Sequence, residues 1–147
     1  MSFDVQYTEG AKVGYKWYKT EHKPMLFLFG FGLSYTSFAY SELTVSADGT
    51  QEGFSQTNTG KRKGAEVAEV YAAIPRSANE PRKRLVGWQK VELAPGQSKT
   101  LTLPMNTLPM SVWDLQANKF ELLKGEYKVM VGGSSAALPL TGSFTLP

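Results

Sequence analysis

The thirteen carboxylates are the residues of this 147-residue chain with the clearest capacity for catalysis. Glycosidase-type acid–base work needs two carboxylates facing one cleft, one of them with a raised pKa. Glu66 and Glu69 are neighbours in sequence, but a spacing of three places them on opposite faces of a strand. Asp114 follows Trp113, where a turn or cap role is favoured. We therefore expect no catalytic carboxylate in this chain.

Other reactive residue types are scarce. The chain has no cysteine, which excludes thiolate metal sites, disulfides and a cysteine nucleophile. Its single histidine, His22, lies in a polar loop and is expected to be exposed. Ser134-Ser135 lacks the Gly-x-Ser-x-Gly pattern and a later histidine, so a hairpin turn is favoured. Gly30-Phe31-Gly32 has no third glycine at dinucleotide-binding spacing. We expect no catalytic residue, no bound cofactor and no metal site.

Two basic clusters, Lys61-Arg62-Lys63 and Arg82-Lys83-Arg84, lie in predicted loops. A solvated rim is the favoured interpretation, and a joint anion-binding patch is the alternative. The net charge of +3 gives only a weak attraction to polyanions. No run of 18 or more apolar residues marks a membrane span. We therefore expect neither a nucleic acid nor a membrane as a partner.

Residues 1–38 are expected to form an irregular arm, because they show no sustained helical or strand period. Ten aromatic residues give this segment much apolar surface that must be buried. The arm either packs on its own sandwich or connects to another domain. Six of its aromatics are the candidate domain-docking residues: Tyr15, Trp17, Phe27, Phe29, Phe31 and Tyr35.

Residues 39–147 show short strands separated by turns. In residues 66–74 one face carries four small or branched apolar side chains, whereas Val67 and Tyr71 lie on the other. This pattern is typical of a central strand or of one covered on its outer side. Asp48-Gly49 and Ala94-Pro95-Gly96 predict turns. The further strands are predicted over residues 42–47, 52–58, 85–93, 100–103, 126–131 and 140–146.

The strand over residues 85–93 changes phase, since Val86 and Trp88 share one parity and Val91 and Leu93 the other. A one-residue bulge near Gln89-Lys90 would place both pairs on one face. Apolar neighbours predict core positions for Trp88 and for Trp113. About seven strands without a long helix predict an all-β fold, an antiparallel sandwich of immunoglobulin or fibronectin type III type. A closed barrel is the alternative.

Residues 27–36, Phe-Leu-Phe-Gly-Phe-Gly-Leu-Ser-Tyr-Thr, resemble the Phe-Pro-Phe-Gly-x-Gly-Leu-Ser-Tyr-Thr signature of family 3 glycoside hydrolases, chiefly β-glucosidases. That signature precedes their C-terminal fibronectin type III-like domain. Leu28, Glu69 and Gln97 depart from the family pattern at surface or turn positions. Further matches follow in the family's order over nearly the whole chain, at residues 9–10, 13–18, 57–60, 64–67, 71, 85–91, 95–100, 113–114, 125–132 and 134–135.

The resemblance implies a non-catalytic accessory domain of a retaining β-glucosidase that hydrolyses terminal β-D-glucosides. In that family a nucleophilic aspartate lies on a TIM-like barrel and the acid/base glutamate in a following α/β sandwich domain. No family catalytic residue corresponds to a position here. Residues 1–38 would be the connector from the catalytic domains. Residues 39–147 would be the sandwich that braces them, with dimerisation or substrate approach as further roles.

The parent's barrel and α/β sandwich domains are therefore the expected partners, and a homodimer is a further one. The resemblance favours a periplasmic or secreted location, although this chain shows no secretory signal. The alternative function is an autonomous carbohydrate-binding or cell-surface adhesion sandwich. An exposed aromatic such as Trp17 would then stack on sugar rings.

Overall fold

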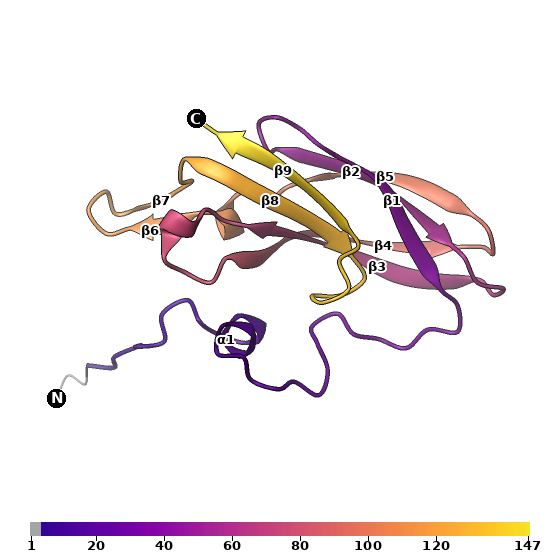
Figure 1. Ribbon diagram of the computed structural model, residues 1–147, viewed down its shortest axis with the longest axis horizontal. Coiled ribbons are helices and arrows are strands. Elements are labelled where there is room, and N and C mark those ends of the chain that lie inside the picture. Colours follow the sequence, from indigo (N-terminus) through magenta and orange to yellow (C-terminus); the bar gives the residue numbers. More distant parts are fainter. Residues whose placement is uncertain (1–3) are drawn as a thin grey trace.

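Two antiparallel sheets face each other in this computed structural model, which describes residues 4–147 (Figure 1). Residues 1–3 of the predicted arm, Phe3 among them, lie outside the described residues. The three-stranded sheet has the order β1-β2-β5, with β1 Phe38–Val45, β2 Gln51–Asn58 and β5 Ser98–Pro104. The four-stranded sheet has the order β4-β3-β8-β9, with β3 Gly64–Ala73, β4 Lys83–Leu93, β8 Gly125–Gly132 and β9 Leu140–Leu146.

These seven strands confirm the predicted sandwich, because they form two separate open sheets rather than a closed barrel. The sequence predicts neither the short helix α1 (Tyr15–Thr20) nor the hairpin of β6 (Val112–Asp114) and β7 (Lys119–Glu121). Two 3₁₀ turns, Arg76–Ala78 and Leu108–Met110, complete the elements. Within residues 4–147 no helix is long and apolar enough to cross a membrane.

The core lies between the sheets and follows the alternation predicted for β3. Ala68, Val70, Ala72 and Ile74 are fully buried and face the three-stranded sheet. Tyr71 is also fully buried, although it lies on the opposite face of the strand. Because β3 is a central strand, its outer face must be covered by something other than the second sheet.

The bulge in β4 lies earlier in the strand than predicted, so the Trp88 side chain lies on the outer face of the sheet and not in the core. Val70 pairs with Gly87 and Tyr71 with Leu85, so the extra residue is Val86 rather than one near Gln89-Lys90. Trp88 then pairs with Glu69 on the outer face and is 66% exposed. The predicted core position of Trp88 is therefore wrong.

Trp113 is not a core residue either. It lies on β6, where its ring packs edge-on against Phe120 of β7 at a centroid distance of 5.0 Å. The β6–β7 hairpin forms its own small sheet, so alternation there does not direct a side chain between the two large sheets. The predicted turn role of Asp114 is confirmed, because its Oδ1 accepts the N–H groups of Gln116 and Ala117 at 2.7 and 3.0 Å.

A carboxylate is buried without a partner in the core. Glu52 of β2 is 1% exposed, and neither of its oxygens has a hydrogen-bond partner. Its carboxylate faces Gly87 of β4 across the sandwich. Burial raises the pKa of the Glu52 carboxyl from 4.5 to about 7, because the charged form loses hydration that nothing replaces.

This raised pKa predicts that the chain loses stability as the pH rises. The folded state binds the Glu52 proton more tightly than the unfolded state, so stability falls between about pH 4.5 and pH 7 and is then constant. Glu52→Leu should abolish about 3 kcal/mol of this fall in the free energy of unfolding. Urea denaturation at pH 5 and pH 8 measures it. Glu126→Gln, at an exposed position, should keep the wild-type fall, and a wild-type stability equal at both pH values would contradict the prediction.

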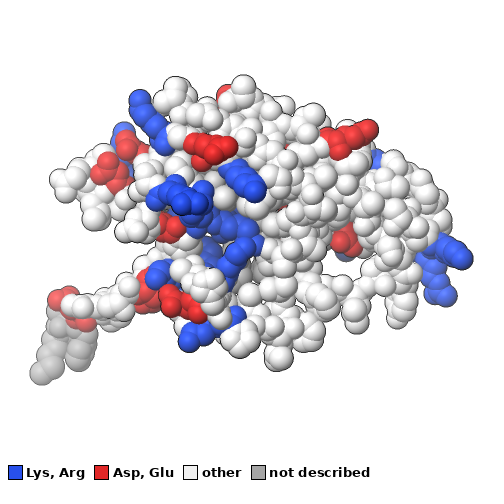
Figure 2. Space-filling view, in the orientation of Figure 1, with Lys and Arg blue, Asp and Glu red and all other residues white. Residues whose placement is uncertain are grey.

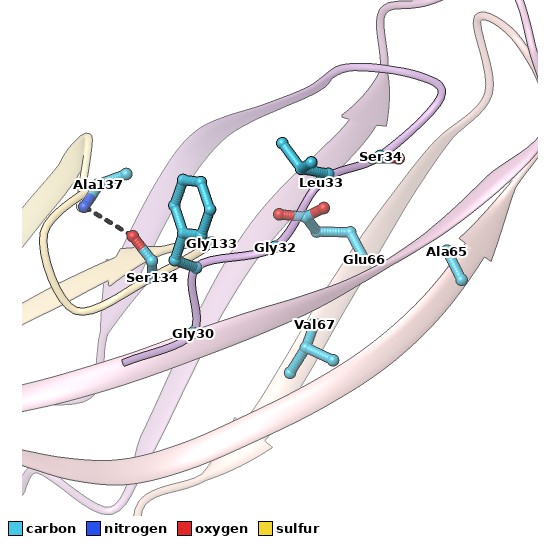
Figure 3. A pocket seen from close by; sticks show the side chains of 11 residues that line it. Gly30, Gly32, Leu33, Ser34, Ala65, Glu66, Val67, Gly133, Ser134 and Ala137 are labelled. Atoms are coloured by element: carbon cyan, nitrogen blue, oxygen red, sulfur yellow. Dashed lines mark hydrogen bonds between the residues drawn. The ribbon is translucent and has the colours of Figure 1, made fainter. Parts of the chain in front are cut away.

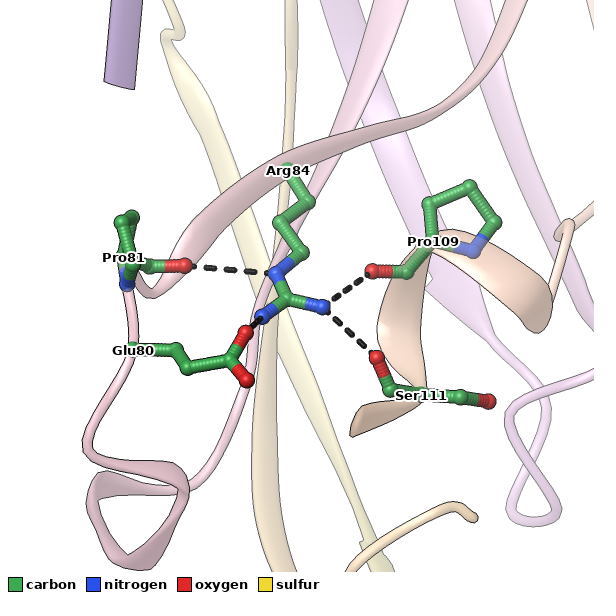
Figure 4. A network of polar contacts seen from close by, with 5 residues as sticks. All are labelled: Glu80, Pro81, Arg84, Pro109 and Ser111. Atoms are coloured by element: carbon green, nitrogen blue, oxygen red, sulfur yellow. Dashed lines mark hydrogen bonds and ion pairs between the residues drawn. The ribbon is translucent and has the colours of Figure 1, made fainter. Parts of the chain in front are cut away.

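Arg84 of β4 joins the sandwich to the segment before β6 (Figure 4). Its Nη1 donates to the carbonyls of Pro109 and Ser111 at 2.9 and 2.7 Å, and its Nε donates to that of Pro81 at 3.2 Å. Its Nη2 binds the Glu80 carboxylate. Arg84 is 9% exposed, so the expectation of a solvated rim is wrong for this member of its cluster.

Replacing Arg84 should be costly, because three carbonyls and a carboxylate would lose their donor together. We expect Arg84→Met to lower the free energy of unfolding by about 2–3 kcal/mol, less than for a fully buried pair because Glu80 is partly exposed. Arg62→Met, at an exposed site, should change it by less than about 0.5 kcal/mol. Equal losses in the two variants, measured by thermal or urea unfolding, would disprove the bracing role of Arg84.

Candidate domain-docking surface

Residues 4–37, here called the strap, run along the outer face of the four-stranded sheet (Figure 1). Helix α1 of the strap is only six residues long and has no side-chain cap, so packing must hold it. Tyr15 provides that packing. Its ring lies edge-on against Tyr71 at 6.1 Å, and its hydroxyl accepts the N–H of Leu85 at 3.2 Å.

Further anchors follow along the strap. The carbonyl of Phe29 accepts the N–H of Ser135 at 2.8 Å. The Thr36 hydroxyl donates to Asn58 Oδ1 at 2.6 Å, and the Ser37 carbonyl accepts the N–H of Thr59 at 2.8 Å. These contacts join the strap to the β8–β9 connection and to the end of β2. The strap is therefore fixed to its own sandwich at both ends of the sheet.

Glu69 lies beneath the strap, whereas Glu66 lies on the opposite face of β3 at the border of the strap. Glu69 accepts the Tyr71 hydroxyl at 2.7 Å and is 5% exposed, because Gly30 passes directly over its carboxylate. Glu66 lies beside Gly133 and the Tyr40 hydroxyl, and it lines a cavity of about 370 Å³ that Gly32 and Leu33 of the strap also border (Figure 3). Burial raises the pKa of both carboxyls.

This pair does not form a glycosidase-type site. The predicted opposite faces are confirmed, since Glu69 pairs with the exposed Trp88 and Glu66 with the buried Val91. Glu69 is closed off by Gly30, which leaves Glu66 as the accessible carboxylate of the two. Acid–base hydrolysis needs two carboxylates in one cleft. Among residues 4–147, no group of three or more His, Cys, Asp or Glu residues is placed to hold a metal.

The outward side of the strap carries an exposed aromatic surface. Phe27 and Phe31 stack at 5.2 Å and are 72% and 53% exposed. Tyr35 is 91% exposed, and the neighbouring Leu26 and Leu33 are exposed to a similar degree. We call these five residues the aromatic face.

The six predicted docking residues divide between two directions. Tyr15 points inward and Phe29 packs on it at 5.5 Å. Phe27, Phe31 and Tyr35 belong to the aromatic face. Trp17 packs edge-on against Tyr18 at 5.0 Å and stays 37% exposed. Sequence reasoning missed Leu26 and Leu33, although their position between the aromatics could have indicated a shared surface.

The remaining candidates have structural or solvent positions. His22 is exposed, as predicted. The Ser134 hydroxyl accepts the N–H of Ala137 at 3.1 Å within the β8–β9 connection. Gly30-Phe31-Gly32 opens no helix. The two basic clusters lie at opposite ends of the β3–β4 pair, because Gly64 pairs with Leu93 and Ala73 with Lys83, so they form no joint patch.

Comparison with known proteins identifies this architecture. Residues 66–135 match the model of the fibronectin type III-like domain. This chain contains a fibronectin type III-like domain, and over nearly its whole length it is similar to part of the GH3 β-glucosidases. The predicted resemblance is confirmed.

The relatives of this fibronectin type III-like domain are β-glucosidases. A probable β-glucosidase K of Emericella nidulans is 39% identical over 94% of this chain and 17% of its own length. β-Glucosidase 3B of Thermotoga neapolitana superposes with a TM-score of 0.86 at 36% identity, over 95% of this chain and 20% of that one. A GH3 β-glucosidase of Bifidobacterium adolescentis gives 0.89 at 34% identity, over 95% and 21%. The chain thus spans about a fifth of the length of these relatives.

A substitution at Gly30, which lies directly over the Glu69 carboxylate, should detach the strap from the sheet without unfolding the sandwich. Gly30 has a φ of 79°, and a Cβ there would overlap the Glu69 carboxylate. Gly30→Ala should therefore speed hydrogen exchange of the Ser135 amide by about tenfold or more, while core amides of β3 keep their protection. Gly32→Ala is the matched control, since nothing lies within 4 Å of its Cβ position. Equal exchange rates in the two variants would show that Gly30 does not seat the strap.

Proposed function

We propose that this chain is the non-catalytic C-terminal accessory domain of a retaining β-glucosidase, and that it braces the catalytic domains through the aromatic face. The strap is already fixed to the sandwich by Tyr15, Gly30 and Thr36, so burying its own core does not require the exposed Phe27, Phe31 and Tyr35. This outward aromatic face is the observation that carries the proposal.

Energetics favour a covered aromatic face. Contiguous exposed apolar patches mark interaction sites, and burial stabilises by roughly 25 cal/mol per Å² of apolar surface. The β-glucosidase relatives contain about four-fifths of their length outside the matched region. In our proposal, the barrel and the α/β sandwich domain of such an enzyme pack against the aromatic face. The parent's hydrolysis of terminal β-D-glucosides belongs to those domains.

The first test is the intact mass of the natural gene product. The proposal expects roughly 80 kDa, about five times the 16.2 kDa of this chain. In that product Phe27→Ser with Phe31→Ser should lower the melting temperature by several degrees, because exposed phenyl rings would no longer dock. The same pair in the 147-residue chain should leave its melting temperature nearly unchanged. Leu115→Ser, an exposed apolar position on the β6–β7 hairpin, is the control.

Three outcomes would contradict the proposal. A natural gene product of 16 kDa would show that this chain is not part of a larger enzyme. Hydrolysis of an aryl β-glucoside by the 147-residue chain, at the rate of a full-length enzyme, would make the chain catalytic. An equal loss of stability in the long and short forms of the double Phe variant would mean that the two rings only support the strap. A homodimer that uses the same face would instead appear as a doubled mass of the 147-residue chain in solution.

Trp88 favours a second candidate function, the binding of carbohydrate by this domain itself. Its indole is 66% exposed on the outer face of β4, where a flat ring could stack on a pyranose. Calorimetric titration of the same chain with cello-oligosaccharides distinguishes the two functions. Binding heat that is lost in Trp88→Ala and kept in Trp17→Ala would favour the carbohydrate role over the bracing role.

A further inference from the structure

Four cationic side chains line a groove between α1 and the start of β4, and we call it the lysine groove. Lys16 and Lys19 belong to α1, Lys83 is the first residue of β4, and Arg82 directly precedes it. Figure 2 shows Lys and Arg side chains gathered in the hollow between the strap and the sandwich. Two adjoining cavities of about 270 and 440 Å³ open here, and both are lined by Tyr15, Lys19, Lys83 and Met130.

The lysines of the groove repel each other. Burial, and after it the adjacent Lys19 ammonium, lowers the pKa of Lys83 to about 8. Burial likewise lowers the pKa of Lys16, with the Arg84 guanidinium as the second cause. At pH 7 Lys83 still carries its charge, so the fold holds several like charges together in a half-buried place.

The carboxylates near the groove bind other partners. Glu69 accepts the Tyr71 hydroxyl, and Glu80 binds Arg84. Glu21 pairs with Lys12 at 3.1 Å. Within residues 4–147, none of the four cations of the groove forms an ion pair. Glu69 and Glu80 act on Lys83 and Lys16 from a distance, but the pKa of both lysines stays lowered, so the groove keeps positive charge that these carboxylates offset only in part.

Several donors remain free to point at a ligand. Lys83 donates to the Ser135 carbonyl and lies over the Tyr71 ring at 5.0 Å, which leaves two of its three N–H groups. Arg82 uses its Nε on the Ile74 carbonyl at 2.9 Å, so its Nη groups remain. Tyr15 and Met130 form an apolar wall that lowers the local dielectric and strengthens charge-assisted hydrogen bonds.

We propose that the lysine groove is a binding site for an oxyanion, a phosphate or carboxylate group held by Lys16, Lys19, Arg82 and Lys83. Ammonium and guanidinium donors converging from two elements are the usual recognition of such groups. The bound anion offsets the repulsion between α1 and β4, so it also ties the strap to the sandwich. The site does not depend on the aromatic face or on a parent enzyme.

The test is a titration of the 147-residue chain with sodium phosphate at pH 7, with ionic strength held constant by sodium chloride. Amide and lysine Nζ resonances of the groove are followed by NMR. We expect saturable shifts at millimolar phosphate and a rise in the pKa of Lys83 as phosphate binds. Lys19→Met keeps the aliphatic stem and should weaken binding about fivefold, the loss of one charge-assisted contact. It should also raise the pKa of Lys83 without phosphate.

Lys61→Met is the matched control, because Lys61 is an exposed lysine near the opposite end of the β3–β4 pair. It should bind phosphate as the wild type does. A second titration, with sodium acetate at the same ionic strength, distinguishes between the possible sources of the bound oxyanion. Saturation by phosphate alone supports a phosphorylated small molecule, and saturation by both supports a carboxylate supplied by another protein segment. Shifts that grow linearly with phosphate, or equal affinities in Lys19→Met and Lys61→Met, would overturn the proposal.

Discussion

The outer face of β3 is the constraint on which the rest of the structure depends. A central strand with apolar residues on both faces cannot leave either face in water, and Tyr71 is fully buried on the side away from the second sheet. The strap meets this need through the Tyr15 ring and through Gly30 above Glu69. Its path then determines which of its aromatics turn inward and which remain exposed.

Much of the sandwich could be predicted, because strand alternation depends on local sequence alone. The phase of β4 could not, since the parities of Val86 and Val91 allow a bulge at several positions between them. Its place is determined by the pairing with β3, where Val70 pairs with Gly87 and Tyr71 with Leu85. Gly87 was the available signal, because a glycine inside a strand often marks a bulge or a close approach. Glu52 was unpredictable for the opposite reason, since a polar side chain on a core position contradicts the pattern that defines the core.

The strap shows what amino-acid composition can predict about a segment and what it cannot. Ten aromatics without a period predict that apolar surface must be covered, but they do not say by what. The structure answers for Tyr15, which packs on the sandwich, and shows that Phe27, Phe31 and Tyr35 face outward. The two interpretations of the arm were alternatives for the whole segment, whereas the structure assigns different directions to neighbouring side chains of one segment.

The cluster Arg82-Lys83-Arg84 illustrates why a run of like charges has no single meaning on a strand. Successive side chains of β4 point to opposite faces, so Lys83 lies on the outer face beside Tyr71 while Arg84 turns inward to the Pro109 and Ser111 carbonyls. The partner cluster at Lys61-Arg62-Lys63 is separated from it by the length of β3, roughly 30 Å for ten residues. That distance exceeds the Debye length of about 8 Å at physiological salt, so each cluster acts on its surroundings alone. A long polyanion would find two isolated contacts, whereas a small oxyanion finds in the lysine groove several donors and an apolar wall within one site.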